Sequence, residues 1–304
     1  MDSQVIETPN ADVGNQAAAD FMNQQVGRVT APSASQFDLS LLEDALARGW
    51  AENGFFILRG LVAPDVCDAM SAAAIDLFTR AEDDGHSFAG HHFGDSGVIA
   101  VEEAARVGSG AAADQRMSKL FNLHRKEPFR SFASHPTVLR ALHAILGPDV
   151  SCFNSQYIFK NPGVWGQPWH QDSLYYAFDR MPQVGVWLAT SKATVENGCL
   201  FVAPGSHLEP ILPHVPDARP GSNFGYVEVV DYDYARAVPA LMEPGDVLVF
   251  HSFLLHKSND NVSDDRRSAL VYHYGHSATE VLGPRSATID FMPVLEGGEP
   301  VTAG

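Results

Sequence analysis

The chain has 304 residues, of which 45% are hydrophobic, so it is long enough to bury a sizeable core. A formal net charge of −17 argues against nucleic acid and anionic membrane surfaces as partners. Three widely spaced cysteines exclude a disulfide framework, and no apolar run reaches membrane-spanning length. We therefore expect a cytosolic protein without a leader peptide or a membrane anchor.

The first part of the chain predicts an arm followed by two helices. Residues 1–35 are rich in Ala, Asn, Gln, Ser and Pro, and we expect a flexible N-terminal arm. Apolar residues at helical spacing predict an amphipathic helix over 38–50, which Gly54 ends. A short strand is expected over 55–58, and Pro64 is placed to open a second helix through about residue 80.

The next segment, residues 83–115, is rich in Gly, Ala and Asp and contains His86, His91 and His92. Long loops are uncommon in a compact domain, so we expect this one to be functional or mobile. The three histidines could form a second metal site, but a solvated loop is the simpler interpretation.

Beyond a third helix, predicted over 135–146, the chain is mainly β structure. Helices followed by a run of antiparallel strands indicate an α+β protein with a jelly-roll core and flanking N-terminal helices. We place a single domain over 36–304, with the jelly roll at about 150–276. The predicted strands lie at 151–160, 167–172, 183–190, 198–203, 225–231, 247–252 and 267–275.

The segment Trp169-His170-Gln171-Asp172 is the most specific chemical signal in the sequence. On an extended segment His170 and Asp172 share one face, because strand side chains alternate. A third ligand, His256, is available after a run of predicted strands. Two imidazoles and one carboxylate on one face of a metal, with other positions open, are typical of non-haem Fe(II) oxygenases.

Two choices between neighbouring residues stay open at this level. His251 and His256 both lie near the end of one predicted strand, and Ser258 favours His256 because its hydroxyl could reach a co-substrate beside the metal. Only one of the adjacent Arg266 and Arg267 should point inward, where it could clamp a carboxylate. The other is expected to be a solvated charge, and spacing does not choose between them.

The motifs form an ordered set along the chain. They are Trp169-His170-Gln171-Asp172, Glu196-Asn197-Gly198-Cys199-Leu200, Pro204-Gly205-Ser206-His207, Gly245 through His251, and Leu255-His256-Lys257-Ser258 through Asn261 to Arg266-Arg267. Over roughly residues 50–276 this set resembles the phytanoyl-CoA dioxygenase (PhyH) family. The resemblance implies a double-stranded β-helix, or cupin-like, fold that uses Fe(II), 2-oxoglutarate and O₂.

Carried over position by position, the resemblance assigns roles to individual residues. The iron ligands fall on His170, Asp172 and His256, and the arginine that clamps the 2-oxoglutarate carboxylate falls on Arg267. Asn154 shares a strand face with one further candidate, Gln156, and two amides on an interior face would need a polar ligand, although an exposed face would explain them equally. The remaining co-substrate contacts implied by the resemblance are Ser258, Trp187, Gln156, Lys119 and Gln171.

The implied activity is that of an Fe(II)/2-oxoglutarate-dependent dioxygenase, an oxidoreductase that hydroxylates an unactivated carbon of a small organic molecule and releases succinate and CO₂. Asp172 favours hydroxylation over halogenation, because a halogenase of this fold needs a small residue there. Alternatives are desaturation, epimerisation or ring formation in a biosynthetic pathway, or a non-catalytic metal-binding sensor, which an intact ligand set disfavours. Acyl-CoA substrates occur in the family, but the negative net charge weakly disfavours them. The sequence gives no oligomeric state.

Other segments have two interpretations each. The aromatic segment 175–178 could wall the substrate pocket or belong to the core. Asn197-Gly198 is most simply a hairpin turn, and His214 has no obvious partner in its loop. Residues 83–115 and 208–224 are the candidates for lid and specificity elements.

Overall fold

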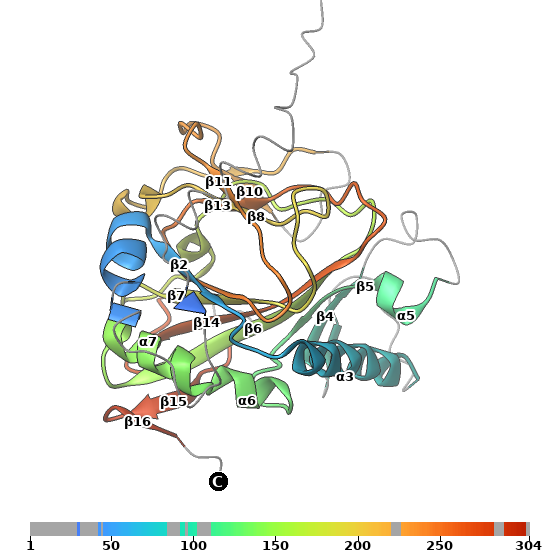
Figure 1. The fold of residues 1–304 in the computed structure, drawn as a ribbon, viewed down its shortest axis with the longest axis horizontal. Helices are drawn as coiled ribbons and strands as arrows, with labels where there is room; N and C mark the ends of the chain where they lie inside the picture. Colours follow the sequence, from blue (N-terminus) through green and yellow to red (C-terminus); the bar gives the residue numbers. More distant parts are fainter. Residues whose placement is uncertain are drawn as a thin grey trace, which may run out of the picture.

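A large curled sheet, a smaller sheet over one of its faces and helices over the other make up the protein (Figure 1). The computed structural model describes residues 29–30, 42–43, 45–83, 92–94, 97–101, 111–219, 226–282 and 289–301. The α+β jelly-roll architecture predicted from the sequence is confirmed.

The large sheet has the strand order β1-β2-β12-β7-β14-β6-β5-β4-β3, and β15 extends it beside β6 and pairs with β16. Its neighbours are antiparallel except β1 and β2. Its central strands are buried on both faces, which is why they read as nearly continuous apolar runs. The strands are β1 (Val29–Thr30), β2 (Phe55–Arg59), β3 (His92–Gly94), β4 (Gly97–Val101), β5 (Met117–Phe121), β6 (Val150–Lys160), β7 (Val184–Ala189), β12 (Val247–His251), β14 (Arg267–His276), β15 (Met292–Glu296) and β16 (Glu299–Pro300).

The small sheet has the order β11-β8-β13 and carries the late metal motif. In its register His256 is opposite Val202 and Ser258 is opposite Leu200. Since these two residues are separated by two positions, both side chains point to the same side of β13. The strands are β8 (Leu200–Val202), β11 (Val238–Ala240) and β13 (His256–Ser258), and a separate pair is formed by β9 (Val215–Pro216) and β10 (Val227–Glu228).

Helices α3 (Pro64–Asp83) and α7 (Pro136–Leu146) lie where the sequence predicts them, and the described part of the helix expected over 38–50 includes the π-helix η1 (Ala45–Asn53), which ends directly before Gly54. Helix α7 follows His135, whose Nδ1 accepts the Thr137 N–H, and it ends at Gly147 with φ +91°. No helix within the described ranges combines the length and apolar character needed to cross a membrane. The helices are η1 (Ala45–Asn53), α3 (Pro64–Asp83), α5 (Ala113–Arg116), α6 (Phe129–Ala133), α7 (Pro136–Leu146), η2 (Asp172–Tyr175) and η3 (Ser206–Leu208).

Alternation along β6 and β14 separates a helix-facing side from an inner side. On the helix-facing side, the Tyr272 hydroxyl donates to the Phe129 carbonyl of α6 at 2.7 Å, and the Tyr274 hydroxyl donates to the Ala133 carbonyl at 3.0 Å. These bonds satisfy buried phenols and attach α6 to the sheet. The opposite side of both strands is therefore free to line a site.

The prediction of a strand over 167–172 is wrong. Its backbone makes one antiparallel bridge, between His170 and His256, and Asp172 then begins the 3₁₀ helix η2. Pro168 has no N–H to donate, so a regular ladder cannot extend through it. Of the strand predicted over 225–231, the described residues 226–231 contain one two-residue strand, β10 (Val227–Glu228).

The prediction of a loop over 83–115 is also partly wrong, because this segment contains β3, β4 and most of α5. His86 and His91 lie outside the described residues, as do segments 102–110 and 220–225 of the expected lids. Of the expected N-terminal arm, only Val29–Thr30 is described, and it pairs with β2.

Gly245, in the turn before β12, cannot carry a side chain. Its φ is +90°, and a Cβ would lie 1.8 Å from the carbonyl oxygen of Val62. We expect Gly245→Ala to lower the free energy of unfolding by about 3–4 kcal/mol, measured by urea denaturation. Gly163→Ala is the control, because its φ of +78° has open space around the Cβ, and we expect a loss of about 1 kcal/mol. Equal losses would contradict the close contact at Gly245.

Candidate active site

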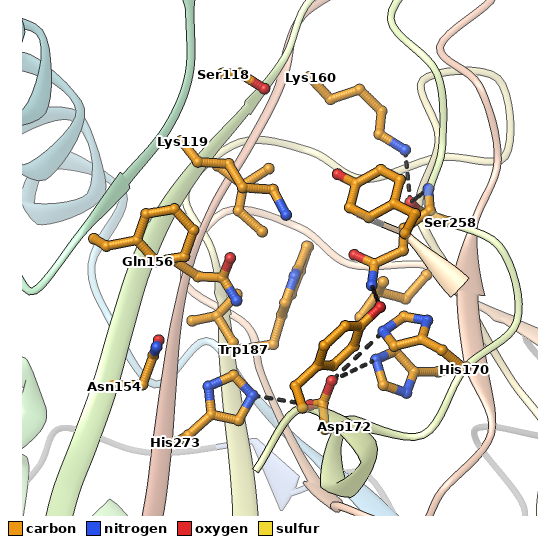
Figure 2. Close-up of a pocket in the computed structure, with 18 of the residues that line it drawn as sticks. Ser118, Lys119, Asn154, Gln156, Lys160, His170, Asp172, Trp187, Ser258 and His273 are labelled. Atoms are coloured by element: carbon orange, nitrogen blue, oxygen red, sulfur yellow. Dashed lines mark hydrogen bonds and ion pairs between the residues drawn. The ribbon is translucent and has the colours of Figure 1, made fainter. Parts of the chain in front are cut away.

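Three side chains from distant parts of the chain converge at one end of a pocket (Figure 2). One donor atom from each of His170, Asp172 and His256 lies within 4.8 Å of the others, and all three residues are buried. The backbones of His170 and His256 exchange hydrogen bonds of 3.0 and 3.1 Å. Directly paired residues of this kind face each other, and their ring centroids lie 4.1 Å apart.

The backbone also decides which nitrogen of each imidazole faces the cluster. Nδ1 of His170 lies 2.7 Å from the Pro168 carbonyl, and Nδ1 of His256 lies 3.0 Å from the Leu254 carbonyl. A carbonyl only accepts, so each Nδ1 carries the proton and each Nε2 keeps its lone pair. The two Nε2 atoms lie 3.5 and 3.6 Å from Oδ1 of Asp172. Burial, and then the nearby His170, lower the pKa of His256 to about 4, which keeps it in the neutral form that binds metals.

Asp172 is held by a further histidine that the sequence motifs did not reveal. Nε2 of His273 lies 2.9 Å from Oδ2 of Asp172. Burial by itself would raise the pKa of Asp172, but His256 and His273 outweigh it and hold that pKa well below its usual range. The carboxylate is therefore ionised and oriented. The sequence does contain a signal for this residue: His273 and Arg267 are separated by an even number of positions on one strand, so their side chains point to the same face.

The other end of the pocket carries the buried guanidinium of Arg267. It is 2% exposed, lies 5.5 Å from the centroid of the Trp187 ring, and donates to the Gly198 carbonyl from Nε at 3.2 Å and Nη2 at 2.9 Å. Its Nη1 is buried and has no hydrogen-bond partner among the described residues. Burial lowers the pKa of Arg267 to about 10. An unpartnered donor on a buried cation fits an anionic ligand.

The adjacent Arg266 points to the opposite side of β14. Its Nη1 lies 2.6 Å from Oδ2 of Asp114, and its guanidinium lies 5.0 Å from the centroid of the Phe159 ring. The expectation that the outer arginine is a solvated charge is therefore wrong, because Arg266 attaches β14 to α5.

Lys160 is a second buried cation that the motifs did not reveal. It is 4% exposed and directly opposite Arg267 in the register of β6 with β14. Its Nζ donates to Oγ of Ser258 at 2.7 Å and to the Asn259 carbonyl at 2.6 Å. Burial, and then Arg267, lower the pKa of Lys160 well below its usual range. The only sequence signal was its even spacing from Asn154 along β6.

These groups line one pocket of about 320 Å³ between the two sheets. The structure places Ser258, Trp187, Gln156, Lys119 and Asn154 on its wall. In the aromatic segment 175–178, Tyr175 and Tyr176 line the pocket, and Tyr176 also packs with Phe178 in a small core cluster. Further aromatic wall residues are Phe121, Trp165, Tyr226 and Phe250.

Gln171 does not line the pocket, contrary to the expectation that it contacts the co-substrate. Its Nε2 donates to the carbonyls of Pro210 and Phe253 at 3.1 and 2.9 Å, and its Oε1 accepts the Leu212 N–H at 2.8 Å. A residue between two inward-facing neighbours on extended backbone points outward. Gln171 therefore anchors the loop beside the site. His214 in that loop also has a partner, because its Nε2 accepts the backbone N–H of Gln171 at 3.2 Å.

His251 stays out of the metal cluster. Its Nδ1 accepts the Phe253 N–H at 2.9 Å, and its ring packs against Trp50 and His207. Burial, and then His207, lower the pKa of His251 to about 4. The geometry thus selects His256 of the two histidines considered.

Comparison with known proteins agrees with this site. The family model for phytanoyl-CoA dioxygenase (PhyH) matches residues 50–269. The peroxisomal phytanoyl-CoA dioxygenase of Mus musculus is 27% identical over 280 residues, which cover 87% of this chain and 80% of that protein. Phytanoyl-CoA dioxygenase domain-containing protein 1 of Rattus norvegicus is 29% identical over 277 residues, which cover 81% of this chain and 94% of that protein.

Solved structures share the fold. The non-heme monooxygenase ThoJ matches with a TM-score of 0.60 at 23% identity, over 83% of this chain and 84% of that chain. EvdO2 of Micromonospora carbonacea var. aurantiaca, complexed with 2-oxoglutarate, matches with a TM-score of 0.53 at 21% identity, over 79% of this chain and 94% of that chain. With a family model matched over most of its length, the chain belongs to the phytanoyl-CoA dioxygenase family and is an oxidoreductase that uses Fe(II), 2-oxoglutarate and O₂.

Proposed function

We propose that this protein hydroxylates an unactivated carbon of a small organic molecule while 2-oxoglutarate is converted to succinate and CO₂. The observation that carries the proposal is one pocket with a two-histidine, one-carboxylate cluster at one end and the unpartnered Nη1 of Arg267 at the other. His170, Asp172 and His256 would hold Fe(II), whose chemistry when bound is the activation of O₂ for oxidation of a C–H bond.

The chain's own residues bind and orient the two organic molecules. Arg267 and Ser258 would hold the distal carboxylate of 2-oxoglutarate. His256 and Ser258 stand two residues apart on β13, about 6.6 Å along a strand, so one short element sets the spacing between the metal end and the carboxylate end. Gln156, Lys119 and Trp187 line the wall between them. Aromatic rings line much of the remaining wall of this space.

The substrate space favours a small molecule, because about 320 Å³ must hold the co-substrate as well. The alternative products are those of desaturation, epimerisation or ring formation on the same scaffold. The epimerase SnoN, solved with Fe³⁺, alpha ketoglutarate and nogalamycin RO, shares the fold with a TM-score of 0.57 at 17% identity. Product analysis separates these reactions. The cytosolic location stays a prediction.

Anaerobic reconstitution of the purified protein with Fe(II) and 2-oxoglutarate tests the proposal. We expect a weak visible charge-transfer band in the wild type and none in His170→Ala. When O₂ is then added together with a substrate that the enzyme oxidises, the wild type should release succinate. A metal chelator should abolish succinate release, and Fe(II) should restore it. Bound iron without the band would show that 2-oxoglutarate does not bind at this metal site.

A further inference from the structure

Two buried cations meet at the end of the pocket remote from the metal cluster. Lys160 and Arg267 are direct cross-strand partners, and like charges placed opposite each other destabilise an antiparallel pair. Within the described ranges of the chain, neither forms an ion pair with a carboxylate. Asp260 acts on Lys160 electrostatically, but its Oδ1 accepts the Gly166 N–H at 2.7 Å and lies 3.5 Å from Arg219. An anionic ligand at this end of the pocket would balance the guanidinium and would favour the charged form of Lys160, whose pKa burial and Arg267 lower.

The backbone of Gly198 lies against both buried basic side chains. Its carbonyl accepts two hydrogen bonds from Arg267, and its φ is +80°. A Cβ there would lie 2.8 Å from Cδ of Lys160 and 2.5 Å from the Asn259 carbonyl oxygen. The turn that the sequence suggests as a simple hairpin thus also holds the charged end of the pocket.

Lys160 determines which way the Ser258 hydroxyl donates. Oγ of Ser258 accepts from Nζ of Lys160 at 2.7 Å and from the backbone N–H of Gln167 at 3.2 Å (Figure 2 shows the first bond). An ammonium and an amide N–H only donate, and a hydroxyl oxygen has two lone pairs. Both acceptor positions are therefore used, so the hydroxyl proton is free only for a third group that accepts.

We propose that Lys160 determines the specificity for the co-substrate: together with Arg267 it makes this end of the pocket select a carboxylate over a neutral group, and it directs the Ser258 proton toward that carboxylate. The inference rests on the proposed function, because the carboxylate meant is the distal one of 2-oxoglutarate. Nζ of Lys160 donates two of its three N–H groups to the protein, which leaves the third for the ligand. A neutral amide in the same place would not balance the two cations and would set its own N–H groups against donors.

A binding experiment with two ligands tests Lys160 without turnover. The full-length protein is loaded anaerobically with Fe(II) and titrated with 2-oxoglutarate or with its 5-methyl ester, in which the distal carboxylate is neutral and has no N–H to close on the ketone. The visible band reports Kd for each, because both ligands keep the 2-oxo acid. We expect Lys160→Met to weaken 2-oxoglutarate binding about 10- to 100-fold and binding of the ester by less than about 3-fold.

The matched control is Lys257→Met, a neighbouring lysine of β13 whose Nζ lies over the Trp169 and Phe201 rings, outside the pocket. It should leave both Kd values unchanged. If Lys160→Met does not fold, Lys160→Gln replaces it, since the amide can still donate to the Asn259 carbonyl without a charge. If the ratio of the two Kd values is unchanged in the Lys160 variants, the inference about Lys160 is wrong, whereas the proposed function stands. A wild type that shows no band with 2-oxoglutarate overturns the proposed function, and this is seen before any variant is compared.

Discussion

An Asp172→Ala variant is expected to lose Fe(II) affinity by about 100-fold or more, and its turnover should fall with it. Even partners that only orient a ligand change metal affinity by about 10- to 100-fold, so removal of the one carboxylate in the cluster should cost at least as much. Oδ1 of Asp172 also lies within 3.6 Å of both ligand Nε2 atoms, so its loss removes the one carboxylate donor from the cluster. Iron content after anaerobic loading and desalting, together with succinate release, measures the effect.

Asp179→Ala is the control for this change. Asp179 follows in the same stretch of chain, and its Oδ1 accepts the Glu280 N–H at 2.7 Å, away from the metal cluster. Its loss should leave iron content and succinate release near the wild-type values. Full iron binding and turnover in Asp172→Ala would remove Asp172 from the ligand set.

The second large effect is expected at Arg267. Replacement by Met should raise Kd and KM for 2-oxoglutarate about 100-fold, because charge-assisted hydrogen bonds to a carboxylate contribute about 1.5–3 kcal/mol each. The long apolar side chain of Met retains part of the packing against Trp187. Kd comes from the anaerobic titration, and KM from initial rates of succinate release.

The neighbouring arginine offers a matched control. Arg266→Met removes the contact with Asp114 on the other side of β14, which is a partly exposed ion pair worth up to about 1 kcal/mol of stability. We expect an unchanged KM for 2-oxoglutarate and a small loss of stability. Equal KM changes in the two variants would show that the pocket position of Arg267 is not what binds the co-substrate.

Local patterns in the sequence determined the elements and the residue types of the candidate site. Strand alternation and helical spacing are properties of the chain itself, so α3, α7 and the long strands β6 and β14 could be predicted. The residue types at 170, 172 and 256 also indicated a metal centre before any fold was known, because few side chains bind Fe(II). The same patterns missed β3, which contains Gly and His, and also β4, although its Val98, Ile99 and Val101 are typical of strands.

Local patterns left adjacent residues equivalent; the family resemblance assigned Arg267 and His256, and the tertiary structure supplies the physical reason for that choice. Which of two adjacent arginines enters the pocket depends on the register of β14 with β6, and that pairing joins distant parts of the chain. The same register places Lys160 beside Arg267, a contact that no motif contains. Gln171 was misassigned because the orientation of a side chain between two ligands depends on the backbone there. Sequence patterns therefore indicate the chemistry available, whereas long-range pairing decides which side chains converge and which buried charges are left for a ligand to balance.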